Sequence, residues 1–489
     1  MSGERLSYRF GPLERRGLLG PLRFGQVAAI GGALALGVEL LDRVGGGGGV
    51  MAALVLLMGA VGLATVPVAG RTVDEWAPVG CAFVVRVVRG RRRFRSQLPV
   101  AGVSTSGRAP ALELPHSVHA VELATIEHNG RNLGVLSERR GRLLTTVLAC
   151  QALSFALLDP EVQERRLAAW GNVLATAANG PIRRMQWIER TTPAQGDELA
   201  RWLHSARDPS LPARGAPVVE SYLELIGQST QVTHDHEILL AIQLDTTRLR
   251  GRSELAPEQA IEQVGQIIRG LESAEVRVLG ALSAGQLARV VRTGFDPYAR
   301  AELAAMDAVK GGSHMLAEHA AGPLAATEAW DHYRCDGAFH ATHWISSWPR
   351  IDVSPMFMDA LLADSGAVRT VAVTFEPIAP ERSAREVEAA ITRDRADSEL
   401  RRRFGQSETA RQRQAQEAAA RREAELAAGH GEVRFSGFVT VSGRDQGELR
   451  RACAEIHRHA ARARLELRRM YGQQAEAFTF TLPLARGLR

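Results

Sequence analysis

The five glycines at residues 45–49 are the feature that most constrains this chain, because they separate two long apolar runs. The first run, residues 24–41, reads FGQVAAIGGALALGVELL and carries only Glu39 as a charge. The second, residues 50–68, reads VMAALVLLMGAVGLATVPV. Each approaches the ~20 residues that cross a bilayer core, and glycine accepts the positive φ values of a tight turn. The pattern predicts a two-helix transmembrane hairpin with spans at about 24–41 and 50–68.

Arginines flank both apolar runs, whereas the loop between them has only Arg43 beside Asp42. The positive-inside rule then places both termini in the cytoplasm, which predicts a multi-pass protein of the inner (plasma) membrane. An alternative is a secretory signal peptide with ALALG, residues 33–37, as its cleavage region. Residues 76–95 are apolar on one helical face and end in arginines, which favours an interfacial segment over a solvated basic linker. Residues 1–99 form this first predicted part.

Length and composition bound the remainder of the chain. A length of 489 residues predicts several structural units rather than one core. The four cysteines are far apart and form no CxxC pattern, which indicates reduced thiols without a disulfide framework. Lys310 is the only lysine, and the net charge is +6. The abundance of arginine therefore fits codon usage better than a phosphate-binding surface.

Short strand-like runs alternate with helical runs from about residue 100, in an order that occurs twice. The first set has strands at 143–151, 182–193, 233–247 and 274–282, with helices at 161–177 and 257–272. The second set has strands at 338–349, 368–380, 433–443 and 475–484, with helices at 356–363 and 447–470. This order predicts an α+β fold of two duplicated ferredoxin-like (split βαβ) halves, at 100–282 and 336–489, with a connector at 283–335.

Helical insertions are predicted within both halves. The insertion of the second half covers about 381–429, and its part at 393–426 is rich in Arg, Glu, Gln and Ala. Such a composition favours a solvated charged helix over an interaction arm.

The sequence motifs give no catalytic, cofactor-binding or metal residue. Lys310 lies in DAVKGGSH, which is not a Walker A motif, and GxSxG, HExxH and the dinucleotide fingerprint do not occur. A zinc-like ligand set is present at His332, Cys335, His340 and His343. His340 and His343 are an odd number of residues apart on one predicted strand, so they should point to opposite faces. His234 and His236 share a face but have no evident third ligand. The prediction is a protein that is not an enzyme and takes no cofactor.

The arginines do not predict nucleic-acid binding either. Acidic residues are interleaved with them, and no aromatic stacking platform accompanies a basic run. No direct contact with nucleic acid is expected.

Several stretches resemble a known family. YRFGPLERRG at residues 8–17, the two apolar runs and the basic segment resemble the PrgI-type small membrane subunit of conjugative type IV secretion systems. The rest is similar to the N-terminal, non-ATPase region of the TraC/CagE-type secretion ATPases. The residues that carry this resemblance are AFHATHWISSWPRIDVSPMFMDALL (338–362), VRTVAVTFEPIAP (368–380), GEVRFSGFVTVSG (431–443) and QQAEAFTFTLPLARGLR (473–489).

The resemblance implies a non-enzymatic inner-membrane docking component of a type IV secretion-like (conjugative transfer) apparatus. Its implied partners are the membrane, a separate P-loop ATPase and other secretion-channel subunits, and the chain would be an oligomer within that complex. In the family, a comparable "lPlgr" ending leads into the P-loop domain, which this sequence lacks. One alternative is an EccE-like component of a type VII system. Another is a membrane-anchored enzyme whose site the motifs miss.

Overall fold

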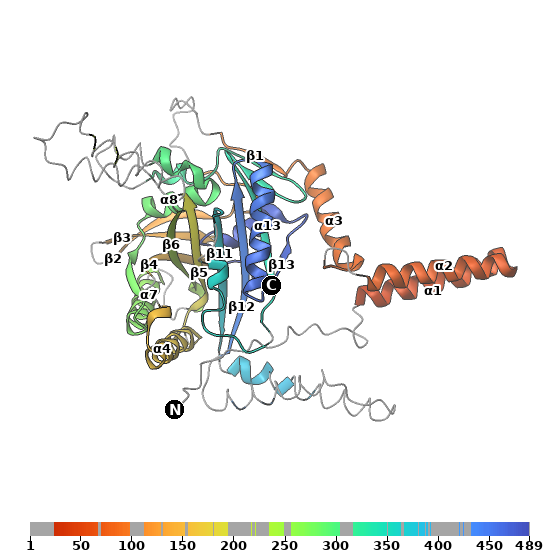
Figure 1. Cartoon of the computed structure of the whole chain (residues 1–489), viewed down its shortest axis with the longest axis horizontal. Coiled ribbons are helices and arrows are strands. Elements are labelled where there is room, and N and C mark those ends of the chain that lie inside the picture. The colour runs from red at the N-terminus through yellow and green to blue at the C-terminus, as the bar shows by residue number, and fades with distance from the viewer. Residues whose placement is uncertain are drawn as a thin grey trace, which may run out of the picture. The chain divides into compact units, whose positions relative to one another are not determined.

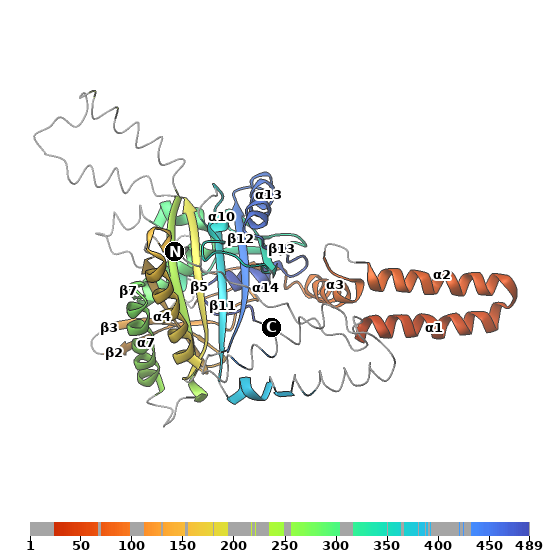
Figure 2. The same ribbon diagram turned by 60° about the horizontal axis from the view of Figure 1, so that its bottom comes forward.

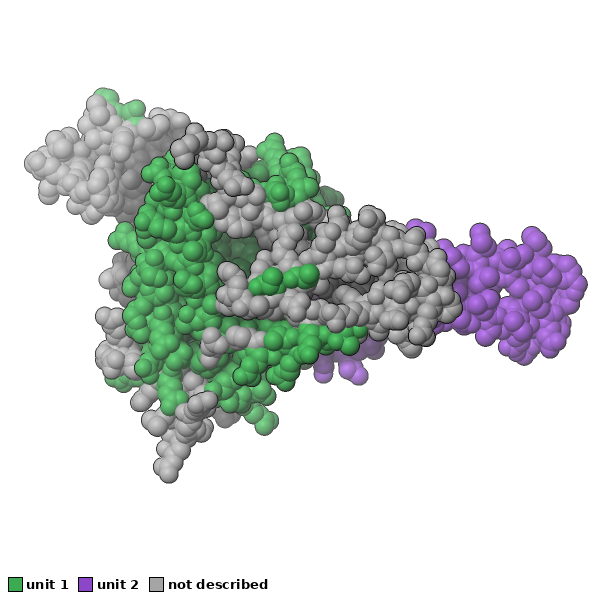
Figure 3. All heavy atoms as spheres, turned by 90° about the horizontal axis from the view of Figure 1, so that it is seen from below, with its two compact units in different colours: residues 1–10, 93–470, 474–489 green, residues 11–92, 471–473 purple. Residues whose placement is uncertain are grey.

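The computed structural model describes residues 24–66, 70–97, 112–128, 131–151, 155–178, 180–193, 234–248, 256–303, 316–349, 351–362, 366–379, 381–386 and 432–488, with a few isolated positions. The chain divides into two compact units, which Figure 3 colours separately. The hairpin unit covers residues 11–92 and 471–473, and the sheet body contains Arg93–Met470 and Gln474–Arg489. The motif at residues 8–17 and the charged segment at 393–426 lie outside the described residues, apart from two isolated positions.

The hairpin unit contains three helices, α1 (Phe24–Val44), α2 (Gly46–Thr65) and α3 (Val73–Val88). Helices α1 and α2 run side by side in opposite directions (Figures 1 and 2). Gly45 and Gly46 have φ values of 57° and 61°, a conformation that glycine adopts at little energetic cost. The turn is therefore only about two residues long, and Gly46 to Gly49 belong to α2 rather than to a loop.

The predicted transmembrane hairpin is wrong. Among the described residues, no helix is long and apolar enough to cross a bilayer. The glycines at the start of α2 leave 16 apolar-run residues, 50–65, or about 24 Å at 1.5 Å per residue, against a hydrocarbon core of about 30 Å. In α1 the apolar run is interrupted by Glu39, and Asp42 and Arg43 follow. The prediction of a multi-pass inner-membrane protein is overturned with it.

The segment at residues 76–95, predicted as interfacial, forms most of α3 and a short strand. Val79 is buried, and the Trp76 ring lies 6.2 Å from that of Tyr471 within the hairpin unit. The Arg86 guanidinium donates to the Gly472 carbonyl. Helix α3 therefore packs on the 471–473 turn with the face that carries Trp76 and Val79.

Among the described residues, the sheet body is built on one sheet of 13 strands, in which neighbouring strands are antiparallel. The main path runs β1-β8-β9-β10-β12-β11-β5-β6-β4-β3-β2, with β13 beside β10 and β7 beside β4. The strands are β1 (Arg93–Arg95), β2 (Glu122–His128), β3 (Arg131–Glu138), β4 (Leu143–Gln151), β5 (Ile182–Pro193), β6 (His234–Asp245), β7 (Arg277–Ala281), β8 (Ala325–Glu328), β9 (Tyr333–Cys335), β10 (Ala338–Ser347), β11 (Arg369–Ile378), β12 (Glu432–Gly443) and β13 (Glu466–Arg469).

The fold predicted as a transmembrane hairpin and two ferredoxin-like halves is thus contradicted, because the strands form one sheet. Two runs of four strands lie within it, in the orders β7-β4-β6-β5 and β13-β10-β12-β11. They meet at the β5–β11 pair, whose register places Val371 opposite Glu189. The residues predicted as a connector supply β8 and β9 to the same sheet. Backbone hydrogen bonding across β5 and β11 therefore makes the two runs one body.

Helices cover both faces of the sheet. Helices α4 (Pro160–Ala178) and α7 (Ala256–Ser273) pack over β4, β5 and β6 (Figure 2), and α10 (Asp359–Leu362) and α13 (Gln446–Arg462) pack over β10, β11 and β12. The alternation along β5 and β11 puts these four helices on the same face. Helix α8 (Ala284–Phe295) and α14 (Gln474–Phe478) contribute to the core of the other face. Ser283 and Gln286 form a capping box that starts α8.

The last predicted strand, at 475–484, is also wrong. Helix α13 ends at Arg462, and Arg464 has a φ of 56°. The chain then forms β13, inside the stretch predicted as helix 447–470. Residues 474–481 form α14 and the 3₁₀ helix η6 (Thr479–Thr481), followed by bends and irregular backbone to 488, in which Ala485 and Gly487 have φ values of 50° and 104°. We name residues 474–488 the C-terminal strap.

Candidate functional site

The histidines of β10 lie on opposite faces of the sheet, as strand alternation predicts. The His340 ring lies 4.7 Å from Phe478, on the face of the C-terminal strap. Its Nε2 lies 2.8 Å from the Phe295 carbonyl and donates to it, while Nδ1, 2.8 Å from the Ser442 Oγ, accepts. Burial lowers the pKa of His340 to about 4. The neutral ring is therefore a structural link between β10, β12 and α8.

His343 faces the helices of the other side. Its ring lies 5.0 Å from His457 of α13, edge to face. Burial, with smaller contributions from His457 and Arg469, lowers the pKa of His343 to about 3. Like His340, it is neutral at physiological pH.

The cysteine and the other histidines considered as metal ligands do not form a cluster with His340 and His343. Cys335 is buried in β9, and burial raises its pKa well above the ordinary value. His332 lies 2.8 Å from Asp331, and His236 lies 3.4 Å from the Glu189 carboxylate. The side chain of His234 is outside the described part of the structure. Within the described ranges, no three His, Cys, Asp or Glu side chains are grouped as metal ligands.

The polar residues that organise the body were missed by the sequence analysis. Gln186 of β5 is fully buried in the sheet. Its Nε2 donates to the Phe480 carbonyl at 2.7 Å, and its Oε1 accepts from the Ala485 amide at 2.8 Å. Gln243 of β6 donates from Nε2 to the Leu484 carbonyl at 3.2 Å. These two amides hold the C-terminal strap to the first run of strands.

The second run of strands holds the strap as well. Thr374 of β11 donates from Oγ1 to the Arg486 carbonyl at 2.8 Å. Thr440 of β12 shares a hydrogen bond of 2.8 Å with Thr481. At the start of the strap, the Gln474 Oε1 accepts from the Thr342 amide at 2.9 Å. The strap therefore crosses the junction between the two runs and is hydrogen-bonded to both.

Arg190 of β5 is a buried charge on the face of the sheet that the strap covers. Its Nη1 lies 3.1 Å from the Glu237 carboxylate and 3.2 Å from the Val290 carbonyl, and its Nη2 lies 3.1 Å from the Thr293 Oγ1. Burial lowers the pKa of Arg190, while Glu237 opposes the shift. The neighbouring cavity measures about 10 Å³, which is room for about one water molecule. These contacts tie β5 to β6 and α8.

A second polar group lies on the helix-covered face at the β5–β11 junction. Burial raises the pKa of the Glu189 carboxyl, and His236 and Arg369 oppose that shift. Arg369 of β11 is buried, and its Nη2 donates to the Leu362 carbonyl at the end of α10. Burial also raises the pKa of Asp359 in α10. These groups connect β5, in the first run of strands, to β11 and α10 of the second.

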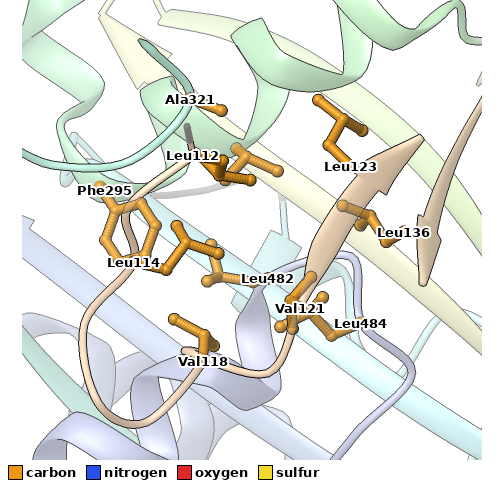
Figure 4. A pocket seen from close by; sticks show the side chains of 11 residues that line it. Leu112, Leu114, Val118, Val121, Leu123, Leu136, Phe295, Ala321, Leu482 and Leu484 are labelled. Carbon is orange, nitrogen blue, oxygen red and sulfur yellow. The ribbon is translucent and has the colours of Figure 1, made fainter. Parts of the chain in front are cut away.

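Figure 4 shows the apolar cavity beside the strap. It measures about 10 Å³, and the side chains drawn around it are all apolar. The lining comes from residues 112–136, α8, Ala321 and the strap, which contributes Leu482 and Leu484 (Figure 4). Such a space is an imperfection of core packing and offers no polar group to orient a ligand.

Most of the polar side chains described above thus bond neighbouring elements of the body, whereas the ring nitrogens of His343 have no hydrogen-bond partner among the described residues. Comparison with known proteins adds no assignment: no family model matches the chain, and no curated protein matches its sequence.

Proposed function

We propose that this chain is a non-catalytic docking component of a type IV secretion-like apparatus of the conjugative kind. It recruits a separate P-loop ATPase and other subunits of the secretion channel. The sheet body acts as a rigid frame that presents the docking surface.

The observation that carries the proposal is the C-terminal strap. Leu482, Leu484 and Arg486 belong to the LPLAR run that resembles the ending before the motor domain of secretion ATPases. That run is held by Gln186, Gln243 and Thr374, from both runs of strands. Arg486 also forms an ion pair with Glu138, at 3.1 Å. A mechanical load on the strap would therefore be shared by the whole sheet, as a frame for a motor requires.

The interior polar groups support the non-catalytic part of the proposal. Arg190, His340 and Gln186 each bond neighbouring elements at ordinary hydrogen-bond distances. An active site instead needs groups held ready for a reacting atom in a space that admits substrate.

The test is co-purification of the tagged full-length chain from its native cells after chemical cross-linking, with bound chains identified by mass spectrometry. We expect a separate P-loop ATPase and further secretion subunits. Recovery of an EccC-like ATPase would assign the chain to a type VII system instead. Recovery of the folded chain alone, or ATP hydrolysis by the purified chain above background, would contradict the proposal.

A pair of variants makes the test specific for the strap. The double variant Gln186→Ala with Gln243→Ala removes the amides that hold the strap and should lower recovery of the ATPase. Gln163→Ala is the matched control. Gln163 of α4 also donates to two backbone carbonyls, those of Phe155 and Leu158, which precede α4. This variant should leave recovery unchanged. Equal recovery with both variants would exclude the strap from docking.

A further inference from the structure

The imidazole of His343 is buried in β10 without a hydrogen bond. The side chain is 0% exposed, and neither Nδ1 nor Nε2 has a hydrogen-bond partner among the described residues. On the other face of the same strand, His340 uses both ring nitrogens. Buried polar groups normally have at least one partner, so this exception calls for a physical explanation.

The groups that face His343 do not stabilise a proton on it. The residue opposite on β12 is Val439, and the residue opposite on β13 is Arg469. From α13, the His457 ring lies edge to face at a centroid distance of 5.0 Å. The carboxylate of Asp331 lies 3.6 Å from Arg469 Nη2. No described carboxylate forms a hydrogen bond with His343, so its protonated ring would meet a fixed cation and a second histidine.

Helix α13 covers the strand face that carries His343. Ala341 and Ile345 flank His343 on that face of β10, and their side chains share a cluster with Leu449 and Ile456 of α13. These two are the only large apolar side chains that α13 buries. Helix α8, on the other face of the sheet, buries four such side chains: Leu287, Val290, Val291 and Phe295. The apolar contact that holds α13 is therefore smaller than that of α8.

The other titratable side chains between α13 and the body do not oppose this contact in acid. Burial raises the pKa of the Cys453 thiol, so the thiol stays uncharged. His459 Nδ1 lies 2.9 Å from the Ala360 carbonyl, to which a protonated ring still donates. Glu455 accepts from the Gly366 amide at 3.2 Å. The two histidines that face each other between α13 and β10 are therefore the groups whose protonation opposes closure.

We propose that His343 makes α13 a cover of β10 that acid releases. While α13 is closed, the imidazole stays neutral because no neighbouring group accepts its proton. When α13 moves away, water reaches the ring and stabilises the protonated form. The protonated ring then opposes closure, because Arg469 and His457 would face it again. His457 is exposed at the edge of this contact. This inference does not depend on the proposed function.

The size of the effect follows from the pKa of His343 in the two states. Burial, with smaller contributions from His457 and Arg469, holds this pKa at about 3 in the closed state, and in water it is about 6.5. Between these values only the open state binds the proton, so closure is favoured above pH 6.5 and weakens as the pH falls towards 3. From pH 7.5 to pH 5.5 the open population of α13 should rise about tenfold.

The experiment is hydrogen exchange with mass spectrometry on the full-length chain at pH 7.5 and pH 5.5, corrected for the intrinsic pH dependence of exchange. Peptides from α13 should show the roughly tenfold rise in opening. Helix α7, which covers the first run of strands and contains no histidine, is the internal control and should change less. An equal change in α13 and α7 would mean that the body opens only as a whole, and would overturn the proposal, as would no change in α13.

Two variants assign the effect to one ring. His343→Leu should remove most of the rise in α13, and His343→Gln, which also takes up no proton, should act in the same way if the leucine variant does not fold. His457→Gln is the matched control, because it removes the neighbouring exposed histidine but leaves the buried one, and it should keep most of the rise. A rise that persists without His343, or that disappears only without His457, would overturn the proposal.

Discussion

The sheet body and the hairpin unit place polar and apolar side chains in opposite ways. In the body, Arg190, Arg369 and Gln186 are buried within the sheet layer. In the hairpin unit, Met58 and Val55 lie in the open, and α2 has no charged side chain. The body has thus buried groups that ordinarily stay in water, while the hairpin exposes groups that ordinarily leave it.

The difference teaches where each region obtains its stability. Buried polar groups are tolerated when they are hydrogen-bonded, and the bonds of Gln186 and Arg190 meet that condition. The body therefore satisfies much of its polar interior, but both ring nitrogens of the buried His343 have no hydrogen-bond partner among the described residues. The hairpin has little interior beyond the contact of α1 with α2. Its stability therefore depends on what covers the exposed apolar side chains of these two helices.

Removal of Arg190 should give the largest effect on the body. Arg190→Met keeps much of the side-chain volume but leaves the Val290 carbonyl, the Thr293 hydroxyl and Glu237 without the guanidinium. Breaking a buried pair from one side costs about 3–5 kcal/mol. Urea unfolding followed by circular dichroism should show a lower midpoint of the body's transition.

The control for this prediction is the exposed pair of Arg382 with Glu386. Their side chains are 55% and 37% exposed and lie 3.0 Å apart. Exposed pairs contribute about 0–1 kcal/mol, so Arg382→Met should shift the midpoint far less. Similar shifts for the two variants would mean that Arg190 is not a structural charge of the interior.

Replacement of a glycine by alanine should change stability in opposite directions in the two regions. Gly134 of β3 faces α8, and an added Cβ would lie 2.6 Å from the Ala284 backbone nitrogen. Backbone atoms cannot move as freely as side chains, so Gly134→Ala should destabilise the body by roughly 1–3 kcal/mol. Gly80 of α3 has no described atom within 4 Å of that position. Gly80→Ala should stabilise α3 by up to about 1 kcal/mol.

Hydrogen exchange with mass spectrometry separates the two effects, because it reports on β3 and α3 individually. Faster exchange in β3 of Gly134→Ala and slower exchange in α3 of Gly80→Ala are expected. Equal effects of the same sign would break the contrast between a packed body and an open hairpin unit.

The sequence predicted most strands of the body because their apolar runs are long and bounded by turns. The runs at 182–193 and 433–443 nearly match β5 and β12. The strand prediction failed at 475–484, where FTFTLPL has the composition of a strand but forms the end of α14, η6 and a bend. Hydrogen bonds from Gln186 and Thr440, which are distant in sequence, decide that conformation.

The polar interior was not predictable from spacing. Gln186 lies between Met185 and Trp187 in β5, and nothing local indicates that it is buried rather than solvated. Its partners, Phe480 and Ala485, are about 300 residues away, at separations of 294 and 299. The prediction of a transmembrane hairpin failed for another reason. The glycine run resembles a loop, but four of its glycines belong to α2 and shorten the apolar run of that helix. A glycine run does not distinguish a turn from a glycine-rich helix end.

The smallest expected effect is a pH dependence that belongs to the body alone. The pKa of His343 is about 3 in the folded chain, against about 6.5 for an unperturbed histidine. Below pH 6.5 the unfolded chain binds a proton that the folded chain refuses, so stability falls as the pH decreases towards 3. Between pH 7.5 and 5.5 this one residue should remove about 1 kcal/mol. His343→Leu should reduce the slope of unfolding free energy against pH over that interval, and the buried His340, with a pKa of about 4, should retain a slope of the same sign. Because α1, α2 and α3 contain no histidine, hydrogen exchange in these helices should not follow the same slope, and an equal slope there would show that the two regions unfold together.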